Sequence, residues 1–229
     1  MPDFAAFGKK IGHTFKNPVL LETAFTHRSY LNENRTKGGE HNERLEFLGD
    51  AVLELVVTEF LFAKYPEKPE GDLTAYRAAL VNTVSIAAAA TTLGMNDYLL
   101  MSRGESRDTG RARQIILANA FEAVIGALHL DAGYAVAKKF IAEQLFHKTD
   151  EVVEKRLWQD AKSKLQEIAQ ERHKVTPTYE VMKQSGPDHD RVFVVGAYIG
   201  EEKLAEGEGR SKQEAEQAAA EKALAAKGW

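Results

Sequence analysis

Residues 42–50, with the sequence NERLEFLGD, constrain the fold of this chain more than any other stretch. Glu43, Glu46 and Asp50 are three, four and seven residues apart, spacings that place side chains on one face of an α-helix. Apolar residues fill the positions between them. Carboxylates on one stripe repel each other, and a divalent cation relieves that repulsion because acidic oxygens are natural ligands of Mg²⁺ and Mn²⁺. The segment therefore predicts a helix that carries a metal-dependent site.

Composition bounds the class of protein. A chain of 229 residues holds one or two domains. It has no cysteine, which excludes disulfides and thiolate metal sites and suits a cytoplasmic protein. The start of the chain lacks the pattern of a secretory signal, and no window of about 18 uninterrupted apolar residues exists, so we expect no membrane partner. The formal net charge of −4 is by itself weak evidence against a nucleic-acid partner.

Helical patterns fill the first two thirds of the chain. Asn17 followed by Pro18 has the residue types of a helix start. A longer helix with apolar periodicity ends in the proline- and glycine-rich turn at residues 65–71. Asp72 is expected to cap one continuous helix that follows this turn. The predicted long helices cover residues 42–65, 72–92, 113–130 and 134–146.

The last third of the chain changes its periodicity. Asp160 is expected to cap a helix, and Ser211 with Glu214 has the spacing of a capping box that opens another. Between them, three segments have the composition of strands: residues 178–184, 191–198 and 202–207. We therefore expect two domains, at residues 1–150 and 158–229, joined by a charged linker at residues 151–157.

A second acidic motif lies in the apolar segment LANAFEAVIGA at residues 117–127. Asn119 and Glu122 are three residues apart and share a helix face. A charged glutamate in such surroundings costs free energy unless it is paired or binds a metal. The alternative is that these acids are solvated or paired with arginine: Arg44, Arg77 or Arg113. Four acids in two such motifs favour the metal site.

Residues 42–52 resemble the signature of the ribonuclease III family, endonucleases specific for double-stranded RNA. Other segments resemble family motifs in the same order: THRSY at 26–30, EGDL at 70–73, residues 117–131, and the C-terminal third. The resemblance covers nearly the whole chain. It implies a multidomain fold, an all-α endonuclease domain followed by an α-β-β-β-α double-stranded RNA-binding domain.

The resemblance also implies which residues act. Glu46, Asp50 and Glu122 match the family's metal ligands for Mg²⁺, with Mn²⁺ as a substitute, and Asp50 and Glu122 match its catalytic residues. Metal ions held there would polarise the scissile phosphate, generate hydroxide from water and stabilise the leaving 3′ oxygen. Family products carry a 5′ phosphate and a 3′ hydroxyl, and the implied role is processing of rRNA and mRNA.

Asn119 departs from the family pattern, which has a metal-binding aspartate at this position. An amide oxygen can ligate a hard cation but brings no formal negative charge. We therefore expect weaker Mg²⁺ affinity and slower turnover, with RNA binding largely intact. Two interpretations stay open: the remaining acids suffice for cleavage, or the chain is a duplex RNA-binding protein with impaired cleavage. The sequence does not say whether Asn119 is natural or engineered.

Three further residues take their roles from the resemblance. Glu43 opens the signature and is expected beside the catalytic cluster. Glu70 matches a catalytic acid near the active-site valley at the interface of a homodimer, and its alternative is a solvent-exposed turn residue. Phe47 is interpreted as a core residue, with an interface role as the alternative.

The C-terminal domain is not basic, with 11 Lys+Arg against 13 Asp+Glu from residue 157 onward. Duplex RNA is recognised largely by shape, 2′-hydroxyls and phosphates, so a few well-placed groups can serve. The expected contacts come from the first helix, the turn between the first two strands, and the start of the last helix. They are Gln166, Glu167, His189, Arg210, Ser211 and Lys212. Without the resemblance, each is an ordinary solvated, turn or capping residue.

Overall fold

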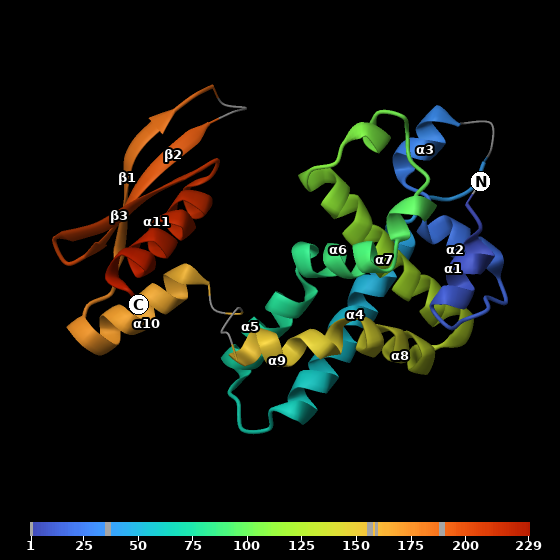
Figure 1. Cartoon of the computed structure of the whole chain (residues 1–229), viewed down its shortest axis with the longest axis horizontal. Coiled ribbons are helices and arrows are strands. Elements are labelled where there is room, and N and C mark those ends of the chain that lie inside the picture. The colour runs from blue at the N-terminus through green and yellow to red at the C-terminus, as the bar shows by residue number, and fades with distance from the viewer. Residues whose placement is uncertain (1, 35–37, 155–157, 159, 188–190) are drawn as a thin grey trace. The chain divides into compact units, whose positions relative to one another are not determined.

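The structure is a computed structural model that describes residues 2–34, 38–154, 158, 160–187 and 191–229. The chain divides into two compact units, residues 1–158 and 159–229. The first unit is helical and the second combines helices with a sheet (Figure 1).

The described helices of the first unit include three short 3₁₀ segments, labelled η. In chain order they are α1 (Phe4–Lys10), α2 (Pro18–Ala24), α3 (Arg28–Glu33), α4 (Glu43–Lys64), α5 (Glu70–Val81), α6 (Thr83–Thr92), η2 (Met95–Tyr98), η3 (Glu105–Arg107), α7 (Arg111–Ala132), α8 (Tyr134–Leu145), η4 (Phe146–Lys148) and α9 (Thr149–Glu154).

The centre of this unit is the pair α4 and α7, which pack against each other (Figure 1). Helix α7 buries most of its length, including Phe121, Val124 and Ile125. By length and composition alone α7 is apolar enough to cross a membrane, but 67% of its most apolar window is buried inside the helical unit. Its apolarity is explained by its place in the core.

The expected continuous helix over residues 72–92 is wrong. Helix α5 already begins at Glu70 and ends at Val81, and α6 begins at Thr83. Asn82 lies between them with an extended backbone, and its side chain accepts a hydrogen bond from the backbone N–H of Ser85 at 2.9 Å. An asparagine that caps a new helix ends the preceding one, which alanine-rich periodicity on either side does not reveal.

The second unit has the predicted order of elements. It comprises α10 (Ala161–His173), β1 (Thr178–Ser185), β2 (Val192–Ile199), β3 (Glu202–Gly209) and α11 (Lys212–Lys227). The sheet is antiparallel in the order β1-β2-β3, with Val181 opposite Val195 and Val195 opposite Gly207. Helix α11 packs against β2 and β3, and α10 packs against α11. The expected α-β-β-β-α domain after an all-α domain is confirmed.

Glycines in β3 bring α11 unusually close to the sheet. A β-carbon on Gly207 would lie 2.1 Å from the backbone nitrogen of Ala219, and one on Gly209 would lie 2.5 Å from that of Ala215. Both alanines are fully buried. The small residues of the strand and the helix therefore fit one another, and larger side chains would push the helix away.

The segment assigned to the linker is partly helical. Residues 151–154 belong to α9, where Val152 and Val153 pack against the core of the helical unit. Residues 155–157 lie outside the described residues. Trp158 packs edge-on against Tyr76 of α5, with ring centroids 5.1 Å apart. The described part of this segment therefore belongs to the helical unit.

Candidate active site

The two acidic motifs are held together by the crossing of α4 and α7. A β-carbon on Gly49 would lie 1.7 Å from the backbone oxygen of Glu122, and one on Gly126 would lie 2.2 Å from the backbone oxygen of Leu45. Only hydrogen atoms fit at these two points, so the backbones approach as closely as helices can. Asp50 follows Gly49 directly in the sequence. The crossing therefore fixes the acid-bearing turns of both helices beside each other.

Glu122 is the most strongly perturbed acid at this crossing. The pKa of its carboxyl is raised to about 8, with burial as the largest cause, followed by the charges of the neighbouring carboxylates of Asp50, Glu46 and Glu54. Both causes disfavour the charged form, because a carboxylate loses hydration on burial and is repelled by like charges. Such a perturbed group among acids is typical of a functional site.

Glu46 and Asn119 are brought together across the two helices. Burial is the largest cause that raises the pKa of Glu46, followed by the charges of Glu43 and Asp50. A side-chain hydrogen bond from Asn119 acts in the opposite direction and favours the carboxylate. An amide N–H₂ can donate this bond, whereas an ionised aspartate cannot. Asn119 therefore supports the charge of Glu46 where an aspartate would oppose it.

The donor set at this crossing fits a hard divalent cation by its chemistry. Glu46, Asp50 and Glu122 supply carboxylate oxygens and Asn119 supplies an amide oxygen. Within the described part of the chain, no three acidic or histidine side chains already converge closely enough to hold a metal ion. Mutual repulsion among these acids contributes, after burial, to the raised pKa of Glu122, and a divalent cation would offset it.

Glu43 lies at the rim of this cluster. It is exposed in the first turn of α4, forms an ion pair with Arg28 at 3.5 Å, and lies 3.8 Å from Nδ1 of His41. The charge of Glu43 contributes to the raised pKa of Glu46, so Glu43 lies near the acids. It is not itself one of the residues at the crossing.

Glu70 lies at the start of α5 and is exposed. Its carboxylate accepts a hydrogen bond from the hydroxyl of Thr74 at 2.8 Å. Among the described residues, the charges that shift the pKa of Glu46 and Glu122 do not include Glu70. Instead it borders a hollow of about 400 Å³ between α4 and α5, whose other lining residues include Phe62 and Leu73.

The interpretation of Phe47 as a core residue is wrong. Its side chain is 81% exposed, on the side of α4 opposite to buried residues such as Leu45 and Val52. The same face of α4 continues with exposed residues at helical spacing: Phe47, Ala51, Leu55, Thr58 and Phe62. We call these five residues the α4 stripe.

The THRSY segment at residues 26–30 braces the start of α4, a role that the sequence analysis did not assign. The backbone N–H of Asn42 donates to the carbonyl of Thr26 at 2.9 Å, and its buried side-chain amide donates to the carbonyl of Ala24 at 3.3 Å. The backbone N–H of His27 donates to the carbonyl of Leu100 at 2.9 Å. Three segments that are distant in the sequence therefore meet just before the acidic helix.

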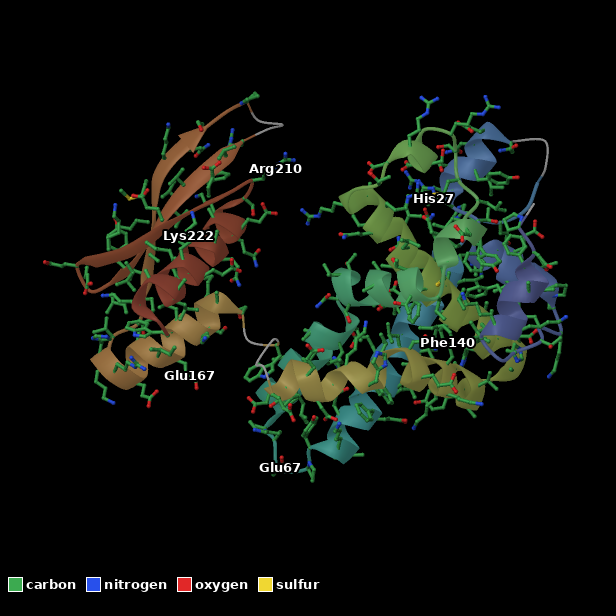
Figure 2. All side chains as sticks on the ribbon, viewed as in Figure 1. His27, Glu67, Phe140, Glu167, Arg210 and Lys222 are labelled. Atoms are coloured by element: carbon green, nitrogen blue, oxygen red, sulfur yellow. The ribbon has the colours of Figure 1, made fainter. Side chains whose placement is uncertain are left out.

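The predicted RNA contacts fall on the second unit. Gln166 and Glu167 are exposed on α10, and Arg210 and Lys212 are exposed at the start of α11; Figure 2 labels Glu167 and Arg210. Ser211 is the N-cap of α11, and His189 lies outside the described residues.

Ser211 caps α11 as expected, and the carboxylate of Glu214 reaches back as in a capping box, although its bond is to the residue before the cap. The backbone N–H of Glu214 donates to Ser211 Oγ at 3.1 Å, and the carboxylate of Glu214 accepts from the backbone N–H of Arg210 at 3.0 Å. Both bonds hold the first turn of the helix and its approach. Ser211 therefore has a structural role that does not depend on RNA.

Comparisons with known proteins agree with both units. Residues 17–149 match the family model described as Ribonuclease-III-like, and residues 161–227 match the double-stranded RNA binding motif. The chain is 46% identical over 217 residues to Ribonuclease 3 of Bdellovibrio bacteriovorus, covering 94% of this chain and 92% of that protein. It is 44% identical over 219 residues to Ribonuclease 3 of Protochlamydia amoebophila, covering 96% and 90%.

A solved structure resembles the first unit. It is the nuclease domain of ribonuclease III from Campylobacter jejuni, described as flexible in the region involved in dimer formation. The likeness has a TM-score of 0.56 and 43% sequence identity, and it covers 62% of this chain and 98% of that one.

Proposed function

The chain belongs to the ribonuclease III family, and we propose that it cleaves double-stranded RNA endonucleolytically with Mg²⁺, or Mn²⁺ in its place, as cofactor. The products would carry a 5′ phosphate and a 3′ hydroxyl, and the substrates would be precursors of rRNA and mRNA in the cytoplasm. One observation carries the proposal. The glycine-lined crossing of α4 and α7 brings two acidic motifs together in a chain that also has a double-stranded RNA-binding domain.

The residues of the crossing would hold the cation and orient the scissile phosphate. A bound divalent cation supplies a Lewis acid for that phosphate and lowers the pKa of water. Asp50 and Glu122 contribute carboxylates from facing turns, and Asn119 orients the carboxylate of Glu46 through its hydrogen bond. Glu43, paired with Arg28, sets the charge at the rim.

We also propose that the active form is a homodimer joined through the α4 stripe. Phe47 and Phe62 are 81% and 73% exposed, which is unusual for phenylalanine unless a partner covers it. The hollow that Glu70 borders lies at one end of this stripe and is lined by Thr58 and Phe62. A second copy would place apolar side chains against it and bring Glu70 toward the interface.

Impaired cleavage remains a second candidate because of Asn119. Its hydrogen bond to Glu46 favours the charged form of that carboxylate without a metal ion. A protein with such a site would keep duplex binding and lose much of its turnover.

One experiment tests both candidates. A long RNA duplex is incubated with the full chain and Mg²⁺, and the product ends are mapped with phosphatase and ligase. We expect fragments with a 5′ phosphate and a 3′ hydroxyl, and no cleavage by Glu122→Gln. If the unaltered chain binds the duplex without cutting it, and Asn119→Asp restores cutting, the second candidate is correct.

A further inference from the structure

His27, in the segment that braces α4, has one ring nitrogen, Nε2, for which the described residues offer no hydrogen-bond partner. We propose that His27 is a hydrogen-bond donor to the backbone of duplex RNA, with its Nε2–H held outward by Ser29 and Ser102. This inference rests on the proposed function, because it assigns one more contact with the same substrate.

The Nδ1 atom of His27 is an acceptor in this structure. The backbone N–H of Ser29 donates to it at 3.3 Å, and the hydroxyl oxygen of Ser29 lies 2.7 Å from it. That hydroxyl accepts the backbone N–H of Ser102 at 3.0 Å, which leaves its own proton directed at the ring. Because two donors point at Nδ1, the proton of the neutral imidazole is on Nε2.

The surroundings of the ring keep it neutral. Burial is the largest effect on the pKa of His27 and lowers it from 6.5. Glu105 of η3 and Glu43 of α4 face the ring and oppose this shift, whereas Arg28 and His41 add to it. The balance favours an uncharged imidazole at neutral pH.

Nε2 is available to a ligand on the side of the acidic cluster where Glu43 lies, since the charge of Glu43 acts on the ring. Among the residues that the structure describes, none is a hydrogen-bond partner of this nitrogen, and the side chain is only half-buried. Figure 2 labels His27 where α3 lies beside the segment that leads to η3. The hydrogen bond from the backbone N–H of His27 to the carbonyl of Leu100 joins these two segments. The carbonyl of the adjoining Thr26 accepts a hydrogen bond from the backbone N–H of Asn42, the residue before α4.

An RNA backbone oxygen matches this donor in kind. Proteins that bind duplex RNA contact mainly phosphates and 2′-hydroxyls, and a neutral N–H serves either. Arg28 lies next to His27 with 68% of its side chain exposed, so a cation is available to the same stretch of backbone.

Two substitutions separate this role from a structural one. Asparagine at position 27 can keep the acceptor near Nδ1 that caps α3, but it has no group at the place of Nε2. Glutamine can put an amide N–H near the place of Nε2 while it weakens the cap. A purely structural role therefore predicts that His27→Asn behaves as the unaltered chain and His27→Gln does not.

The test measures binding of the full chain to a long RNA duplex without divalent cations. We expect His27→Asn to melt normally and to bind roughly 2- to 10-fold more weakly, the range for one lost neutral hydrogen bond. His27→Gln should recover part of that loss. The slope of affinity against salt should not change, because a neutral donor releases no counterion. Unchanged binding by His27→Asn, or no recovery by His27→Gln, would overturn the inference.

Two further measurements complete the design. The ¹⁵N chemical shifts of the His27 ring should report Nδ1 as acceptor and Nε2 as protonated, and the opposite tautomer would contradict the inference. A duplex with 2′-deoxynucleotides in one strand distinguishes a phosphate oxygen from a 2′-hydroxyl as the acceptor. If His27→Asn still binds this duplex more weakly than the unaltered chain does, the acceptor is a phosphate. If the difference in affinity disappears, the acceptor is a 2′-hydroxyl. If the unaltered chain cuts duplex RNA while His27→Asn binds normally, this inference fails and the proposed function stands.

Discussion

The backbone oxygen of Glu122 lies 1.7 Å from where a β-carbon on Gly49 would be, so the two helices of the site touch at a point that admits only glycine. Asp50 is the next residue on one helix, and Glu122 itself belongs to the other. The spacing between the two acidic motifs is therefore set by backbone contact, and the acid-bearing turns cannot move apart without movement of the helices themselves.

Replacement of Gly49 by alanine should damage both stability and activity. The added methyl group overlaps backbone atoms, which cannot yield as the end of a flexible side chain can, and overpacking of this kind costs about 1–3 kcal/mol. Denaturant unfolding and duplex cleavage measure the two effects. Gly71→Ala is the matched control, because nothing lies within 4 Å of a β-carbon on Gly71 near the start of α5. Equal stability of the two variants would contradict the close-contact argument.

Features that depend on neighbouring residues were predictable from the sequence. The caps at Asn17, Asp160 and Ser211 are confirmed, since each side chain accepts a hydrogen bond from a backbone N–H two or three residues later. The shared face of Glu46 and Asp50 follows equally from helix geometry. The placement of two acidic motifs against each other required a family resemblance, because it depends on how distant helices pack.

Phe47 shows why the rest could not be read from periodicity. Helix α4 has apolar residues on two faces, one facing the core through Leu45 and Val52 and one facing solvent through Phe47 and Phe62. Periodicity identifies each face as apolar but does not say which face the protein itself covers. Asn82 illustrates a similar limit, because its capping bond ends a helix that the surrounding alanines favour.

Asn119→Asp should increase metal affinity and turnover. The change replaces the hydrogen bond to Glu46 with a further negative charge, and a unit charge about 4 Å from a cation is worth roughly 1–4 kcal/mol. We expect half-maximal cleavage at a roughly tenfold lower Mg²⁺ concentration. Gln114→Glu is the control, since it adds the same charge at an exposed position of α7. Equal cleavage rates for Asn119→Asp and the unaltered chain would show that the amide does not limit the enzyme.

Without metal, the protein should lose stability as the pH rises toward 8. The pKa of Glu122 is raised from 4.5 to about 8 in the folded state, so its contribution to stability is full below about 4.5 and is lost as the pH rises through about 8. Urea unfolding in a chelator measures this. Glu122→Gln has no titrating group at this position. Its free energy of unfolding, relative to that of the unaltered chain, should therefore increase as the pH rises from about 4.5 to about 8. A constant difference between the two proteins at all pH values would be the contrary result.

Phe47→Glu should produce a folded monomer. The side chain is 81% exposed, so a charge there leaves the core intact but repels an apolar partner surface. Analytical ultracentrifugation should show the loss of the dimer, and cleavage should fall with it. Val19→Glu is the control, because Val19 is 61% exposed on α2 and outside the α4 stripe. The dimer proposal fails if the unaltered chain is itself monomeric at micromolar concentration, or if both variants stay dimeric.

Duplex binding should depend on a few charges at the start of α11. Arg210 and Lys212 are exposed there, and Glu214 beside them is held by the backbone of Arg210, which limits how much positive potential the turn presents. We therefore expect a shallow dependence of affinity on salt, and Arg210→Ala should lower the slope by about 1 because it removes one phosphate contact. Lys222→Ala is the matched control: it removes the same charge farther along α11 (Figure 2) and should leave the slope unchanged. Equal slopes for the two variants would remove the start of α11 from the RNA interface, and its capping box would then be a purely structural feature.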